Sequence, residues 1–160
     1  ILSINEHYIK NLNEEELYKN LKTYAEKYKK EIEDKYEKNL INSIHFLKNK
    51  AKKLEDIYKN AEYIINENII ISDQDLKLLD EISKKIVKDF LNAYQKIDKI
   101  NKETLEKIIK NLIEANNTNF KGVGQPLRIV LTGSKFGPGI YDIIQSLDKN
   151  EVIKRLKMIN

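Results

Sequence analysis

The sequence contains no cysteine and no tryptophan, and it has only two arginines, Arg128 and Arg155, against 27 lysines. The absence of cysteine excludes a disulfide framework and any zinc or redox site with cysteine ligands. The longest purely apolar run, residues 69–71, has three residues, whereas a membrane-spanning helix needs about 20. We therefore expect a cytoplasmic protein that does not enter a membrane.

The length and composition predict a folded chain of one domain or two small modules. Its 160 residues are 41% hydrophobic and 34% charged. The net charge of +4 lies in the last quarter. Residues 1–119 hold 22 basic and 22 acidic side chains, while residues 120–160 hold seven basic and three acidic. This asymmetry indicates an anionic partner. Arginine offers a planar fork of donors that lysine does not, so the two arginines are the first candidates for recognition.

Apolar residues recur at helical spacing through most of the chain. Asn13 followed by three glutamates predicts the start of a helix that extends to residue 28. A second apolar stripe covers residues 40–61. Ser72 with Asp75 forms a capping-box pattern that we expect to open one long helix to residue 97. Asn101 is expected to cap a further helix that ends at residues 116–117.

The composition changes after residue 119, because all five glycines and both prolines fall between residues 122 and 139. Pro126 is expected in the first turn of a short helix and Gly133 at its C-terminal end. Three of residues 128–132 are β-branched, but a strand here would have no partner strand, so we expect these residues to be helical. Asp148 is expected to cap a final helix. The prediction is an all-α fold, a helical bundle of seven or eight helices in two packed subdomains, divided as 1–68, 69–119 and 120–160.

Side chains with catalytic or metal-binding potential form no recognisable set. His7 and His45 have no ligand partners at metal spacing, no carboxylate pair stands out as an acid and a base, and the glycine-rich residues 133–139 lack the Gly-Lys-Ser/Thr ending of a phosphate-binding loop. We expect no catalytic residue, metal or cofactor in this chain. A basic run on one helix is either a solvated face or a set of phosphate contacts: Lys48, Lys50, Lys52 and Lys53.

Residues 120–156 carry the most specific pattern, with Pro-Leu-Arg at 126–128, Leu-Thr-Gly at 131–133, Pro-Gly at 138–139 and a closing Arg-Leu at 155–156. This pattern resembles the C-terminal part of bacterial-type glutamyl-tRNA synthetases, which are class I aminoacyl-tRNA synthetases. Residues 2–10 are similar to the segment that opens the family's anticodon-binding region. The resemblance implies an all-α anticodon-binding region, called an α-helix cage. The chain begins with Ile1 and has one methionine, Met158, so we expect a C-terminal piece of a longer protein.

The same resemblance implies partners and residue roles. The parent would be an ATP-dependent glutamate–tRNA ligase that holds ATP and Mg²⁺ in a catalytic domain absent from this sequence, and the fragment alone would be inactive. The expected partner is tRNA(Glu), with tRNA(Gln) as a further one, bound by a monomer. Arg128 matches the arginine of Pro-Leu-Arg and is expected to read an anticodon base. The other possibility is a surface arginine paired with a carboxylate. The following turn would meet the anticodon loop through Thr132, Gly133 and Lys135.

One position, Asn42, departs from the family pattern, and the role of a second, Arg155, is open. Some members carry an arginine that reads the third anticodon base, and the corresponding position here falls near Asn42, which is uncharged and shorter. Arg155 is either a structural residue or a phosphate contact. Two other functions remain open: the related helical cage of a class I lysyl-tRNA synthetase, and a purely structural helical interaction domain.

Overall fold

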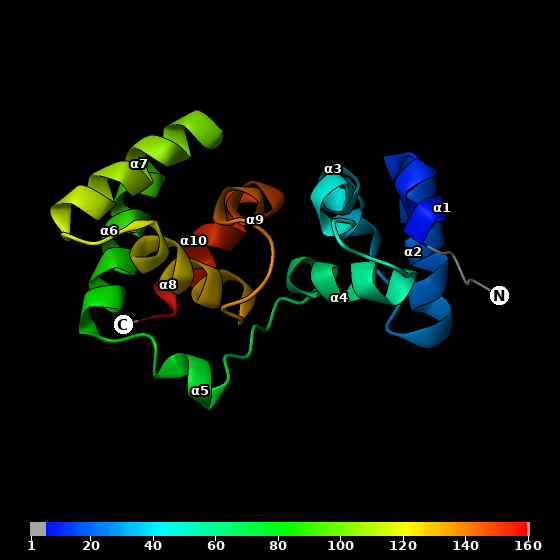
Figure 1. Ribbon diagram of the computed structural model, residues 1–160, viewed down its shortest axis with the longest axis horizontal. Coiled ribbons are helices and arrows are strands. Elements are labelled where there is room, and N and C mark those ends of the chain that lie inside the picture. Colours follow the sequence, from blue (N-terminus) through cyan, green and yellow to red (C-terminus); the bar gives the residue numbers. More distant parts are fainter. Residues whose placement is uncertain (1–5, 160) are drawn as a thin grey trace. The chain divides into compact units, whose positions relative to one another are not determined.

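The computed structural model describes residues 6–159, so the first residues of the segment similar to the family's opening motif, 2–5, lie outside the described part. Within residues 6–159 the chain forms ten α-helices, one 3₁₀ helix and no strand (Figure 1). Eight of the α-helices have seven or more residues, which confirms the predicted all-α fold. The elements are α1 (Glu6–Asn11), α2 (Glu14–Tyr28), η1 (Asp34–Tyr36), α3 (Glu37–Leu47), α4 (Leu54–Ile65), α5 (Asp73–Leu76), α6 (Glu81–Lys96), α7 (Lys102–Ala115), α8 (Phe120–Thr132), α9 (Ile140–Ser146) and α10 (Lys149–Lys157). None of these helices has the length and apolar composition needed to cross a membrane.

The chain divides into two compact units, residues 1–67 and residues 68–160. In the first unit α2 packs against α3 and α4. Its core consists of side chains that are fully buried and recur at helical spacing: Leu17, Leu21, Leu40, Ile44, Ile57 and Ala61. In the second unit α8 packs against α6, α7, α9 and α10 (Figure 1). The helices of segments 69–119 and 120–160 both belong to this second unit.

The start of α2 is confirmed at Asn13, whose Oδ1 accepts a hydrogen bond of 2.8 Å from the backbone N–H of Glu16. The apolar stripe over residues 40–61, in contrast, is split between α3 and α4. Lys50 has a positive φ of 62°, and the Asp56 carboxylate accepts hydrogen bonds from the backbone N–H groups of Lys52 and Lys53 at 2.9 and 3.2 Å. The acceptor at Asp56 opens a new helix. The prediction that the basic run lies on one helix was therefore wrong, because residues 48–53 form the connection between two helices.

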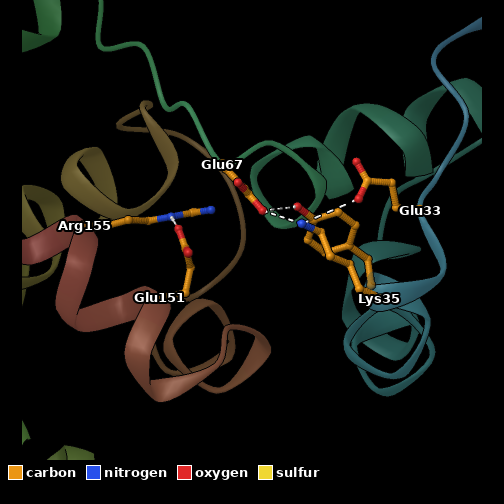
Figure 2. A network of polar contacts seen from close by, with 6 residues as sticks. Glu33, Lys35, Glu67, Glu151 and Arg155 are labelled. Carbon is orange, nitrogen blue, oxygen red and sulfur yellow. Dashed lines mark hydrogen bonds and ion pairs between the residues drawn. The ribbon is translucent and has the colours of Figure 1, made fainter.

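A polar network closes the first unit at its last residue. Glu67 Oε1 accepts from Lys35 Nζ at 2.6 Å and from the Tyr36 hydroxyl at 3.0 Å, and Lys35 also lies 3.5 Å from Glu33 Oε2 (Figure 2). The carboxylate of Glu67 raises the pKa of Lys35. These charges are about half exposed, so solvent screens them and the network adds little to the stability of the fold.

The segment predicted as one helix over residues 72–97 forms two helices, α5 and α6. Ser72 does accept a hydrogen bond from the Asp75 N–H at 3.1 Å, but the helix that it caps is the four-residue α5. The long helix α6 has its own cap, Asp80, whose carboxylate accepts from the Ser83 N–H at 2.8 Å. The expected single helix over residues 72–97 was therefore wrong. The cap of α7 is confirmed, since Asn101 Oδ1 accepts from the backbone N–H of Thr104 at 2.8 Å.

Helix α8 begins earlier than predicted, with Asn119 as its cap, so Pro126 lies inside the helix and not in its first turn. A proline there cannot donate a hydrogen bond to the carbonyl of Gly122. The predicted end is confirmed. Gly133 has a φ of +83°, and its N–H bonds to the carbonyl of Ile129 at 2.7 Å. A Cβ atom at Gly133 would lie 2.8 Å from the backbone oxygen of Ile70, so glycine is required there for both conformation and space. Asp148 precedes α10, as predicted, and its carbonyl accepts from the Val152 N–H at 3.0 Å.

Candidate functional site

Arg128 lies on α8, with its guanidinium held by the loop that follows this helix. Its Nε donates to the carbonyl oxygen of Pro138 at 3.2 Å and its Nη1 to that of Lys135 at 3.4 Å. The side chain is part-buried, and this burial lowers the pKa of Arg128. Among residues 8–159 no carboxylate lies within ion-pair distance of it. A guanidinium has five N–H donors, so this cation is fixed in place with donors beyond the two that the loop uses.

The loop of residues 133–139 is ordered by short polar contacts of its own. The Thr132 hydroxyl lies 2.8 Å from the carbonyl oxygen of Arg128 and accepts a hydrogen bond of 3.2 Å from the Ser134 N–H. The Ser134 hydroxyl accepts from the Phe136 N–H at 3.1 Å. Of the residues expected in this turn, Thr132 and Gly133 shape the backbone and Lys135 supplies both a carbonyl acceptor to Arg128 and an ammonium group. The structure thus brings these predicted residues together on one end of α8.

An open groove of about 590 Å³ lies beside this loop. It is lined by three cations, one amide, two phenylalanines and a glycine, and no acidic side chain is among the lining residues: Phe120, Lys121, Gly124, Gln125, Arg128, Lys135 and Phe136. The arrangement offers positive charge, hydrogen-bond donors and aromatic faces in one place. These are the components that proteins use to hold unpaired nucleotides.

Five of the groove residues were not predicted from the sequence: Phe120, Lys121, Gly124, Gln125 and Phe136. The helical members carried a usable signal, because residues 121, 125 and 128 are separated by four and three positions and therefore share one face of α8. Phe136 carried none, since it belongs to an irregular loop whose shape depends on the contacts of Arg128 and Thr132.

Arg155 is 2% exposed. Its Nε donates to Glu151 Oε2 at 2.7 Å (Figure 2), and its Nη1 donates to the carbonyl oxygen of Leu131 at 2.6 Å. Leu131 lies in the last turn of α8, where carbonyl groups lack partners within the helix. These contacts fit the structural alternative for Arg155, because a guanidinium buried in this way does not present itself to a phosphate.

The other predicted residues belong to the first unit. Asn42 is exposed on α3. The four lysines of the basic run border the connection between α3 and α4, where Lys50, Lys52 and Lys53 are exposed and Lys48 is half-buried. The roles of Asn42 and of the four lysines stay predictions.

The arrangement can be compared with known proteins. Residues 9–159 match the family model described as anticodon binding domain. The chain belongs to the anticodon binding domain family. The resemblance to the anticodon-binding region of glutamyl-tRNA synthetases is thereby confirmed at the level of the family, and the groove described above lies within an anticodon binding domain.

Individual relatives agree with this placement. The chain is 56% identical over 156 residues to the glutamate–tRNA ligase of Pelagibacter ubique (strain HTCC1062), covering 98% of this chain and 34% of that protein. It is 30% identical over 159 residues to glutamate–tRNA ligase 1 of Syntrophus aciditrophicus (strain SB), covering 98% and 33%. The chain therefore spans about a third of the length of these curated relatives.

A solved structure supports the fold of this anticodon binding domain. The crystal structure of a glutamate tRNA ligase from Elizabethkingia meningosepticum CCUG26117 in complex with its amino acid is similar to this chain with a TM-score of 0.81. The two are 21% identical, and the match covers 97% of this chain and 30% of that one. This chain and the matching region of that ligase therefore have the same all-α fold.

Proposed function

We propose that this chain is the anticodon-binding region of a glutamate–tRNA ligase and that its groove beside α8 binds the anticodon loop of tRNA(Glu). The observation that carries the proposal is the guanidinium of Arg128. It is part-buried, held by the carbonyls of Lys135 and Pro138, and faces a groove lined by cations and no acidic side chain. The relatives are named glutamate–tRNA ligases, and the activity and the tRNA partner in this proposal are taken from those names.

The chemistry of this groove suits an unpaired base. Anticodon bases are single-stranded, so a protein can separate them from their neighbours and contact their edges. The fork of Arg128 can donate two parallel hydrogen bonds to one base. Lys121 and Lys135 lie beside it and are suited to the phosphates on either side. Burial strengthens this recognition, because the guanidinium has already lost part of its hydration before RNA binds.

The remainder of the proposal concerns the whole protein. A catalytic domain elsewhere in the parent would activate glutamate with ATP and Mg²⁺ and esterify it to the tRNA held here. We propose a monomer in the cytoplasm, with tRNA(Gln) as a second substrate of the parent.

The test is binding of anticodon stem-loops to the 160-residue chain. We expect a tRNA(Glu) stem-loop to bind with affinity that falls steeply as salt rises, and Arg128→Lys to cost about 1–3 kcal/mol through loss of the bidentate contact. Lys88→Arg is a matched control, since Lys88 is an exposed cation of α6 that does not line this groove. Equal affinity of the wild type and Arg128→Lys for every anticodon variant would contradict the role of Arg128. A preference for the tRNA(Lys) stem-loop would indicate a lysyl enzyme instead.

A further inference from the structure

Phe136 is 75% exposed although it belongs to an ordered loop. The chain has four phenylalanines. Phe46 and Phe90 are buried, whereas the two exposed ones, Phe120 at 45% and Phe136 at 75%, both line the groove that contains Arg128. An aromatic ring left in water gives up the free energy of its burial. Both phenylalanine rings that give up this free energy therefore lie in the same groove.

The position of Phe136 is fixed by its neighbours. Its backbone N–H donates to the Ser134 hydroxyl at 3.1 Å, and the preceding carbonyl, that of Lys135, accepts from Arg128 Nη1 at 3.4 Å. Gly137 follows with a φ of +139°, which turns the chain away directly after the ring. The loop therefore presents the ring at a defined place beside the guanidinium, and little ordering remains to be done when a ligand arrives.

The surroundings of Phe136 suit a nucleobase better than an apolar protein segment. The Lys135 ammonium lies 5.2 Å from the centroid of the Phe136 ring, and the other groove residues include Lys121, Gln125 and Arg128. Cations around an aromatic ring match a ligand that combines a flat π-system with a phosphate. A hydrophobic helix of a protein partner would have to desolvate these charges without compensating them.

We propose that Phe136 is a stacking platform on which one unpaired base of the bound RNA lies, next to the base edge contacted by Arg128. This inference rests on the proposed function. It assigns Phe136 a part in positioning the loop, with the ring providing affinity that does not depend on which base is stacked. Phe120, which is supported by the Tyr141 ring at a centroid distance of 5.9 Å, forms the other aromatic part of the groove.

The absence of tryptophan from the chain permits a direct test. Phe136→Trp introduces a single indole, and we expect its fluorescence to be quenched when a tRNA(Glu) anticodon stem-loop binds. Ile82→Trp is the matched control, because Ile82 is 62% exposed on α6 and does not line the groove. Its fluorescence should not respond. Stem-loops with an abasic nucleotide at each loop position in turn should identify the stacked base, since one of them should abolish the quenching.

Affinities complete the test. Phe136→Ala and Phe136→Leu should each weaken binding by about 5- to 150-fold, while Phe136→Tyr should bind like the wild type. None of these three changes should lower the melting temperature, because the ring is exposed. If the wild type binds in an Arg128-dependent way but Phe136→Ala binds equally well and the indole is not quenched, the stacking role is overturned and the proposed function stands. If the wild type binds no stem-loop, both are overturned.

Discussion

The guanidinium of Arg155 donates a hydrogen bond of 2.6 Å to the backbone carbonyl oxygen of Leu131, joining α10 to the last turn of α8. The same guanidinium is paired with Glu151 at 2.7 Å. A cation at the C-terminal end of a helix interacts favourably with its dipole. The end of α8 is also the start of the loop that holds Phe136 and Lys135. Arg155 therefore holds the end of α8 on which the loop is built, although it does not itself line the groove.

Replacing Arg155 with methionine should lower the free energy of unfolding by about 2–4 kcal/mol. The change keeps the apolar stem but leaves the Leu131 carbonyl and the Glu151 carboxylate without this donor. Lys154→Met is the control, since its side chain is exposed and the expected change is within about 0.5 kcal/mol. Urea denaturation of both variants gives the comparison. Similar stabilities for the two variants would contradict the structural role of Arg155.

Gly133→Ala should destabilise the chain by more than 1 kcal/mol, on the order of 1–3 kcal/mol. The residue has a φ of +83°, and an added Cβ would lie 2.8 Å from the Ile70 oxygen, so strain and a clash act together. Gly139→Ala should be close to neutral, because Gly139 has a φ of −61° and its nearest atom to an added Cβ, in Asp142, is 3.9 Å away. Thermal unfolding of the two variants side by side checks this, and a neutral Gly133→Ala would contradict it.

Tyr94 should make the chain less stable at high pH. Burial raises the pKa of Tyr94 to about 12 from its ordinary 10.0. A group whose pKa is higher in the folded state stabilises fully below the unfolded pKa, and this stabilisation is lost as pH rises from about 10 through about 12. At about 1.4 kcal/mol per pKa unit the loss amounts to about 2–3 kcal/mol.

The variant Tyr94→Phe should remove that alkaline loss. Within the described residues the buried Tyr94 hydroxyl has no hydrogen-bond partner, so the variant should also be as stable as the wild type at pH 7, or more stable by up to about 1 kcal/mol. Tyr28→Phe, at a half-exposed tyrosine, should leave the pH dependence in place. Denaturation series from pH 7 to pH 12 measure both effects, and parallel curves for the wild type and Tyr94→Phe would be the contrary outcome.

Asn42→Arg should sharpen discrimination at the third anticodon base. The side chain is exposed on α3, and a guanidinium there would add the fork that some family members carry, worth about 1–3 kcal/mol between matched and mismatched bases. Asn49→Arg adds the same charge in the exposed connection after α3. Stem-loops differing at the third base should separate the two variants. Equal gains by both on all stem-loops would mean that only charge has been added.

The local signals in the sequence predicted helix ends best where one side chain decides them. Asn13, Asn101 and Gly133 were identified correctly because a cap or a left-handed residue acts over three or four positions. The breaks before α4 and α6 were missed because apolar spacing continues across both of them. In each case a carboxylate accepts a backbone hydrogen bond at the start of a new helix, Asp56 for α4 and Asp80 for α6.

The candidate site was predictable in part for a related reason. Arg128 stood out through composition and through the family pattern, and Lys135 followed from its place in the next turn. The groove itself depends on two features. Helix α8 begins at Phe120, more than one turn before Pro126, and the following loop folds back onto Arg128. Neither follows from periodicity. The start of α8 is set by the Asn119 cap, and the loop is held by contacts of Arg128 with residues seven and ten positions away.

The close approach of Ile70 to Gly133 has a mechanical consequence. Residues 68–72 open the second unit, and within this segment the carbonyl oxygen of Ile70 lies close to Gly133 at the end of α8. A side chain at position 133 would therefore push this opening segment away from α8 and displace the base of the loop that carries Lys135 and Phe136.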